Sequence, residues 1–417
     1  MELIAPAGNL EKLTYAWEYG ADAAYIGLKQ FSLRVKADNF HGEEHRDICE
    51  LKKSYAERGK PKRLLCAMNI SFTDAKIDEL ETELDWFAGF PFDAFIIQDP
   101  GLIDILTSRF PQTALHLSTQ ANCINARAAR FWQQQGFKRL VLGREASLDD
   151  IRRIKDAAPE LELECFAHGA MCIAYSGRCL ISATLTGRSA NAGHCTHSCR
   201  WDWRVLEERE RKGEYFPVLE GEDFTALLSS KDLCMIDHLE DMAQAGVDAL
   251  KIEGRMKSLY YTALVSRAYR KAIDAQAGII SSAEAAPYIS ELDNVAHRAF
   301  TTGFYYSRTE ANSTTKGESS SPYLLAGVIG SCVARYEDGT ADWQFTSMNK
   351  MNSGTPIEFI GPDSPTQYDT AYTLIDPATG MKREWVCHGH PCLIRTDAAL
   401  DQRHIVRFRD PEYQASV

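Results

Sequence analysis

Short apolar runs alternate with amphipathic segments along residues 1–260. The apolar runs begin near residues 3, 23, 63, 93, 114, 139, 161 and 247, and segments with helical spacing of apolar residues follow most of them. Apolar strands joined by helices are typical of parallel sheets that helices cover. Eight such units predict an α/β fold with a TIM-barrel-like (βα)8 domain over residues 1–306. An open, doubly wound sheet is the alternative, because repeated units alone do not show that the sheet closes.

The pattern changes beyond residue 306. Residues 307–322, SRTEANSTTKGESSSP, are polar and predict a linker. Residues 323–417 contain short apolar runs between Gly, Pro and Asp turns, which predicts a small C-terminal β-barrel domain. Within the first domain, residues 232–246 are interpreted as a helix that Asp232 caps and Gly246 ends.

Composition narrows the class of protein. Hydrophobic residues make up 45% of the 417 residues, and the formal net charge is −12. This charge argues against a surface that binds nucleic acid indiscriminately, although it allows a local basic cleft. The N-terminal sequence does not resemble a signal peptide, and no apolar run approaches the roughly 20 residues that a membrane span needs. We therefore expect a cytoplasmic protein without a membrane segment, in which clustered cysteines serve metal or redox chemistry.

Five of the twelve cysteines fall within residues 164–201, a segment rich in Gly, Ser, Thr and Asn that predicts irregular backbone. They are Cys165, Cys172, Cys179, Cys195 and Cys199. Thiolates from one loop, together with one distant cysteine such as Cys234, are a normal ligand set for a [4Fe–4S] cluster. The run HCTHSC offers a mixed Cys/His set for zinc instead. A third interpretation is that the cysteines are packed without any ligand.

Polar side chains end the last strand expected in the barrel, VDALKIEGR at 247–255. Lys251, Glu253 and Arg255 alternate along it, so their side chains share one side of the strand. Ligands of such barrels bind at the C-terminal ends of the strands. Arg255 and Lys251 are therefore candidates for binding a carboxylate or phosphate, with Glu253 orienting them. An ion-pair network that closes the barrel mouth is the alternative.

Three further residues end predicted strands on the same face. His168 precedes Cys172 by four residues and is a candidate general acid or base, or a hydrogen-bonded loop histidine. Gln120, in the run STQ, and Asn69 are candidates for contacting a substrate, although a plain strand end explains both equally well.

Longer motifs carry a resemblance to a known family. Residues 164–182, ECFAHGAMCIAYSGRCLIS, contain Cys-x(4)-Gly-x-Cys from Cys172 to Cys179. The other motifs are APAGN near the start, STQ at 118–120, HCTHSCRW, SSKDL at 229–233 and KIEGRMKS at 251–258. With these motifs the chain resembles the peptidase family U32 over most of residues 1–310.

The resemblance implies a function that the family name does not convey. Motifs of known peptidases, H-E-x-x-H and G-x-S-x-G, are absent from the sequence. Bacterial family members with this layout are similar to proteins required for hydroxylation of the tRNA wobble uridine at C5, a pathway associated with prephenate. We therefore expect a tRNA uridine hydroxylase. A hydrolase acting on peptides, and a non-catalytic partner that binds a homologous U32 protein in an RNA or quinone hydroxylation complex, are the alternatives.

The resemblance also implies a [4Fe–4S] cluster and its ligands. The ligands that match best are Cys172, Cys179, Cys195 and Cys234, with Cys199 as the alternate for one of them. Candidate RNA-contacting residues are basic or aromatic: Arg200, Trp201, Trp203, Arg204, Arg255, Lys257, Arg267, Arg270 and Lys271. An ordinary solvated surface explains these residues as well.

Overall fold

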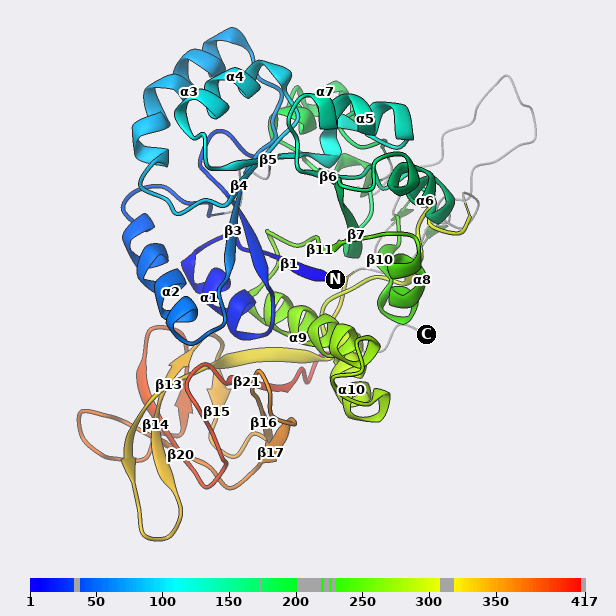
Figure 1. The fold of residues 1–417 in the computed structure, drawn as a ribbon. Coiled ribbons are helices and arrows are strands. Elements are labelled where there is room, and N and C mark those ends of the chain that lie inside the picture. Colours follow the sequence, from blue (N-terminus) through cyan, green and yellow to red (C-terminus); the bar gives the residue numbers. More distant parts are fainter. Residues whose placement is uncertain are drawn as a thin grey trace.

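Eight parallel strands form a closed ring in this computed structural model, which describes residues 1–33, 38–172, 174–200, 219–220, 225–226, 230–307 and 319–413 (Figure 1). The strands are β1 (Glu2–Pro6), β2 (Ala23–Gly27), β3 (Arg63–Met68), β4 (Ala94–Ile97), β5 (Ala114–Leu117), β6 (Arg139–Val141), β7 (Glu162–Ala170) and β11 (Ala249–Ile252). Strand β11 pairs with both β7 and β1, which closes the ring. The predicted TIM-type barrel is confirmed, and the open-sheet alternative is wrong.

Helices surround the ring and begin where the sequence provides caps. The side chains of Asn9, Asn125 and Ser147 each accept a hydrogen bond from a backbone N–H in the first turn of the helix that follows. The helices of the barrel are α1 (Leu10–Glu18), α2 (His45–Glu57), α3 (Asp74–Phe87), α4 (Ile103–Arg109), α5 (Ala126–Gln134), α6 (Leu148–Ala157), α8 (Leu239–Gln244), α9 (Leu259–Gln276) and α10 (Ser282–Ile289). Helices follow most of the barrel strands, as the spacing of apolar residues predicted.

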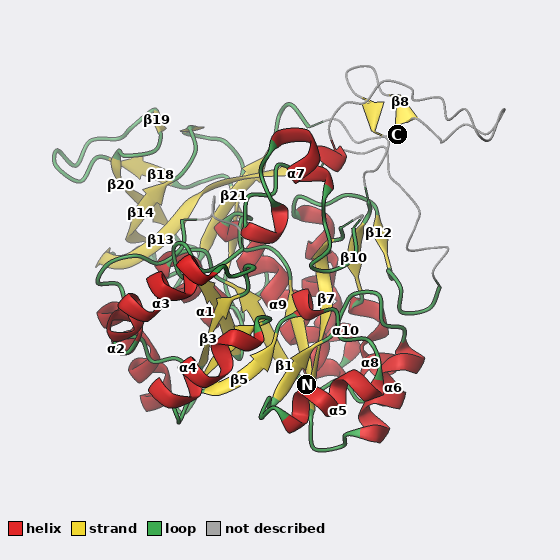
Figure 2. Ribbon diagram, turned by 90° about the horizontal axis from the view of Figure 1, so that it is seen from above, coloured by secondary structure: helices red, strands yellow, loops and turns green. Residues whose placement is uncertain are grey.

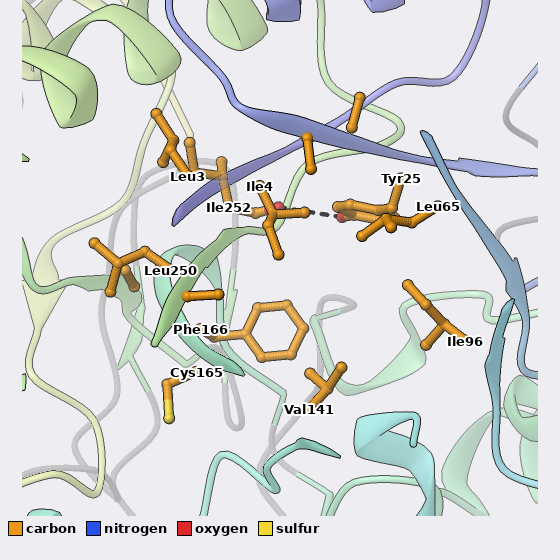
Figure 3. Packing of buried hydrophobic residues seen from close by; sticks show 14 of the residues in the cluster. Leu3, Ile4, Tyr25, Leu65, Ile96, Val141, Cys165, Phe166, Leu250 and Ile252 are labelled. Atoms are coloured by element: carbon orange, nitrogen blue, oxygen red, sulfur yellow. Dashed lines mark hydrogen bonds between the residues drawn. The ribbon is translucent and has the colours of Figure 1, made fainter. Parts of the chain in front are cut away.

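The strands bury side chains on both faces, as strands of a parallel barrel do. Figure 3 shows the ring of Phe166 inside the barrel near Val141, while the neighbouring Cys165 is directed away from it. The Tyr25 hydroxyl donates a 3.2 Å hydrogen bond to the Ile252 carbonyl, which ties β2 to the end of β11 (Figure 3). Alternate residues of β7 therefore serve the barrel interior and the helical layer.

Residues 232–246 do not form the single helix that was predicted. Asp232–Cys234 form strand β10, which is antiparallel to β7 and parallel to β12 (Phe300–Thr301), and α8 begins only at Leu239. The carboxylate of Asp232 binds the guanidinium of Arg298 and caps no helix. Leu233 and Met235, two residues apart, are both buried, as alternate residues of a strand are. This alternation outweighs the helical periodicity of residues 232–246.

The C-terminal region is a curled antiparallel sheet with its own apolar core, as the sequence indicated. Its strands run in the order β17-β16-β21-β13-β14-β20-β18. They are β13 (Tyr323–Arg335), β14 (Ala341–Ser347), β16 (Ile357–Ile360), β17 (Gln367–Asp369), β18 (Thr373–Ile375), β20 (Pro391–Thr396) and β21 (Ile405–Arg409), and β15 (Met351–Asn352) pairs with β19 (Trp385–Val386) nearby. Residues 308–318 of the predicted linker lie outside the described residues.

Helix α9 lies between the barrel and the C-terminal sheet, which sits to one side of the barrel (Figures 1 and 2). The Tyr19 hydroxyl donates to the Ile360 carbonyl at 2.7 Å, and Arg267 donates to the Gly361 carbonyl at 2.7 Å. Arg407 of β21 is buried, with one guanidinium nitrogen 2.5 Å from Glu291 and another 2.6 Å from Glu358. The sheet is thus fixed to the barrel by buried polar contacts.

Candidate active site

A cavity opens at the mouth of the barrel, where the parallel strands end. Its polar lining comes from residues at or just beyond strand ends: Tyr25, Asn69, Ser118, Thr119, Gln120, Arg144, Lys251, Glu253 and Arg255. Three of these side chains are cationic and one is a carboxylate, so the lining is basic. Lys251, Glu253 and Arg255 line this one cavity together with Gln120 and Asn69, but β11 ends at Ile252, so Glu253 and Arg255 follow the strand instead of alternating along it as predicted.

Lys251 and Arg255 are buried and held in place. The Lys251 ammonium lies 2.5 Å from a carboxylate oxygen of Glu164 and 4.2 Å from the centre of the Tyr25 ring. Arg255 donates to the Ser32 hydroxyl at 2.5 Å. A Cβ atom at Gly27 would lie 2.0 Å from a guanidinium nitrogen of Arg255, so only glycine leaves room for this side chain.

Arg144 is a further cation at the mouth that the sequence did not single out. Its guanidinium lies 3.3 Å from Glu253 and 3.7 Å from the centre of the Phe166 ring. Stacking on an aromatic face together with an ion pair fixes a guanidinium well. Arg144 lies three residues beyond β6, so its position after a strand was the available signal.

The segment rich in cysteine lines a second cavity beside the first. Its lining includes Cys172, Tyr175, Ser176, Cys179, Asn191, Cys195, His197 and Cys199. Leu33, Gln120 and Arg144 line both cavities. The thiols and the basic barrel mouth are therefore neighbours that share side chains.

Specific contacts hold this segment against the barrel. The backbone N–H of Ser176 donates to the Glu145 carboxylate at 2.8 Å. Gly177, with φ +71°, approaches so closely that a Cβ there would lie 2.2 Å from the carbonyl oxygen of Gln120. On the other side, the N–H of Ser71 donates to the Asn191 carbonyl at 3.1 Å. Glu145 and Gly177 thus position the thiols over the strand ends.

The donor set of the second cavity fits a [4Fe–4S] cluster, which takes four cysteine thiolates. Four cysteines line it, whereas only part of the zinc set proposed from HCTHSC does so, because His194 is not among the lining residues. The thiols are spread around the cavity wall. Among the described side chains, no three His, Cys, Asp or Glu groups stand close enough to hold a metal ion. Ligation would therefore require these side chains to turn toward one another.

Cys234 lies apart from the other candidate ligands. It ends strand β10 opposite His168, and its Sγ lies 3.9 Å from the Tyr269 hydroxyl. Burial raises the pKa of the Cys234 thiol to about 11. Cys234 does not line the thiol cavity, whereas the alternate, Cys199, does.

His168 is buried between β7 and α9 and lines neither cavity. Its ring contacts those of Tyr261, Tyr269 and Phe300. Burial lowers the pKa of His168 to about 3, so the ring is neutral at physiological pH. This placement corrects the expectation of an acid–base group in the site, because a side chain sealed by aromatic rings cannot reach a substrate in either cavity.

The candidate RNA-contacting residues can be placed only in part. Trp201, Trp203 and Arg204 lie outside the described residues. Three others lie on α9 and are engaged elsewhere: Arg267 binds Gly361, Arg270 pairs with Asp22, and Lys271 pairs with Asp363. An RNA surface made of these α9 residues is therefore not supported.

Comparison with known proteins places these features in a family. The model of peptidase family U32 matches residues 8–315. The "tRNA hydroxylation protein P" of Escherichia coli is 37% identical over 73% of this chain and 74% of its own length. The "tRNA hydroxylation protein P1" of Bacillus subtilis is also 37% identical, over 90% of this chain and 87% of its own.

A relative with a different name is also similar. A protein of Porphyromonas gingivalis named "Collagenase" is 30% identical over 73% of this chain and 73% of its own.

Within the described residues, no helix combines the length and the apolar character that crossing a bilayer requires. The family match covers nearly the whole barrel together with both cavities, and the chain belongs to peptidase family U32.

Proposed function

We propose that this chain is a tRNA-modifying enzyme that hydroxylates the wobble uridine at C5. The observation that carries the proposal is that two neighbouring cavities share Gln120 and Arg144 in their linings. Four cysteines line one of these cavities, and the lining of the other is basic. The names of the relatives from E. coli and B. subtilis support tRNA hydroxylation as the activity.

The cysteines would hold a [4Fe–4S] cluster, which supplies one-electron transfer when bound. Cys172, Cys179 and Cys195 belong to both possible ligand sets. Geometry favours Cys199 as the fourth ligand, because it lines the same cavity, whereas the family resemblance favours Cys234. Glu145 and Gly177 would keep the thiols beside the barrel mouth.

The barrel mouth would bind an anionic co-substrate, for which we propose prephenate. Its carboxylates would meet Arg255 and Lys251, which are buried and line the cavity. Arg144 would lie between this anion and the thiols, and Glu253 would hold Arg144 in place. Burial of these groups limits screening by water, which strengthens their attraction for a carboxylate.

The test is anaerobic purification of the wild type and of Cys172→Ala, followed by iron and sulfide analysis and nucleoside mass spectrometry of tRNA from cells complemented with each. We expect about four irons per wild-type chain, with loss of both the iron and 5-hydroxyuridine in the variant. Zinc in place of iron would contradict the cluster.

Peptide hydrolysis is the second candidate, because one relative is named collagenase. It predicts gelatin cleavage that survives both chelation and Cys172→Ala. Cleavage by the metal-free variant, with tRNA unchanged, would replace the hydroxylase proposal.

A further inference from the structure

The segment that carries the cysteines differs in charge from the rest of the chain. Residues 165–201 contain Arg178, Arg188 and Arg200 but no Asp or Glu, although the whole chain has a formal net charge of −12. A cationic segment in an acidic protein is typical of a surface that meets an anionic partner. This segment also lines the thiol cavity.

Two of these arginines are available to such a partner. Arg178 and Arg188 are exposed on either side of the short helix α7 (Ile181–Thr186). In the part of the chain that the structure describes, neither guanidinium forms an ion pair. By contrast, the exposed Arg46 pairs with Glu43, just before α2, at 2.9 Å, and the exposed Arg152 pairs with Asp149 of α6 at 2.6 Å.

An exposed aromatic ring stands at the entrance of the thiol cavity. Tyr175 is 65% exposed, although it also lines the cavity, and it lies between Cys172 and Cys179 in the sequence. The N–H of the next residue, Ser176, donates to the Glu145 carboxylate, and Gly177 lies close against the Gln120 carbonyl. The backbone that carries the ring is thus anchored, while the ring faces solvent.

We propose that residues 174–188 form the RNA-docking surface of this enzyme, with an unpaired base stacked on Tyr175 and flanking phosphates bound by Arg178 and Arg188. The inference rests on the proposed function, because it assumes an RNA substrate. Stacking of bases on aromatic rings together with arginine–phosphate contacts is how proteins bind single-stranded RNA. A base held on Tyr175 would place its neighbour at the opening that leads past Gln120 and Arg144 to the barrel mouth.

Fluorescence anisotropy at several KCl concentrations measures the binding of an unmodified tRNA transcript and so tests the proposed docking surface. Arg178→Gln with Arg188→Gln removes two phosphate contacts, so the slope of log K against log salt should become shallower by about 1.4 for single-stranded RNA. Tyr175→Ala should weaken binding about 5- to 100-fold, whereas Tyr175→Phe should bind like the wild type because it retains the stacking face.

The matched control is Arg46→Gln with Lys53→Gln, which removes the same charge from exposed positions on α2. The control should leave the salt slope unchanged. Iron content and thermal unfolding are measured for each variant and compared with the wild type, to check that the cysteine-rich segment is intact.

Two kinds of failure are distinguishable. If the wild type hydroxylates tRNA and the loop variants bind tRNA as well as the control does, the docking surface is wrong and the proposed function stands. Wild-type protein that neither binds nor hydroxylates tRNA would overturn the proposed function, and the docking surface with it.

Discussion

At the barrel mouth, the proposed anion site depends on two buried cationic side chains. Arg255 is buried, bonded to Ser32 and packed against Gly27, so its charge is fixed in direction. Lys251 is similarly fixed between Glu164 and Tyr25. Such pre-ordered cations bind a carboxylate without first losing side-chain freedom.

Replacing Arg255 by Gln should raise the KM for prephenate about 10- to 100-fold, because a charge-assisted hydrogen bond contributes about 1.5–3 kcal/mol. Iron content should stay at the wild-type level. Steady-state kinetics of reconstituted protein give the KM. Ser32→Ala is the control, since it keeps the guanidinium and should change the KM by less. An unchanged KM in Arg255→Gln would rule out this residue as the anion ligand.

The fourth ligand of the proposed cluster also depends on a single side chain. Because Cys199 shares a cavity with Cys172, Cys179 and Cys195, Cys199→Ser should lower iron to well below the wild-type level. Cys234→Ser should change iron little, because its thiol packs against Tyr269. Iron analysis after anaerobic reconstitution measures both. The reverse result would favour the ligand set that the family resemblance implies.

At the scale of elements, the position of the cysteine segment depends on one close backbone approach. Gly177→Ala would put a methyl group 2.2 Å from the Gln120 carbonyl. We expect the segment to move off the barrel mouth, with loss of iron and of tRNA hydroxylation, while far-UV circular dichroism shows the barrel intact.

Gly187→Ala is the matched control for that substitution. Gly187 has φ +68°, almost the same as Gly177, but a Cβ there would meet nothing within 4 Å. Both variants therefore carry a similar backbone strain of about 1 kcal/mol, and only Gly177→Ala adds the clash. Equal iron content in the two variants would show that the close approach is unimportant.

Elements and strand-end residues were largely predictable from the sequence, because barrel strands are short apolar runs and caps mark the helices. Lys251, Glu253, Arg255, Gln120 and Asn69 were found for the same reason: each lies at or just beyond the end of a recognisable strand. His168 lies near the end of β7, yet it contacts tyrosine rings of α9, and the register between β7 and β11 shifts just before it. Strand β10 was missed because Asp232–Cys234 pair with residues distant in sequence.

For the whole molecule, the buried ion pair between Arg407 and Glu291 joins the C-terminal sheet to the barrel. Burial alone would raise the pKa of Glu291, but hydrogen bonds and charge from Arg407 outweigh it, and the pKa lies below its usual value of 4.5. A carboxylate with a lowered pKa contributes stability that is fully present above its unfolded pKa and is lost as the pH falls through the folded pKa.

Arg407→Met should therefore lower the free energy of unfolding by about 3–5 kcal/mol at pH 7, because Glu291 and Glu358 both lose the guanidinium of Arg407 as their partner. The difference from the wild type should narrow as the pH falls toward and below 4.5, where Glu291 becomes protonated without its partner. Urea unfolding at pH 7 and pH 4 measures this. A difference independent of pH would show that lost packing, not charge, destabilises the variant.

The direct pairing of β7 with β11 has a consequence for how the protein matures. The barrel closes through these two strands, while the cysteines of residues 172–199 and strand β10 occupy the connection between them. The pairing that closes the ring therefore involves none of these thiols. We expect newly made chains to complete the barrel before the proposed cluster is inserted, so protein from iron-starved cells should be folded and should regain activity when iron and sulfide are restored.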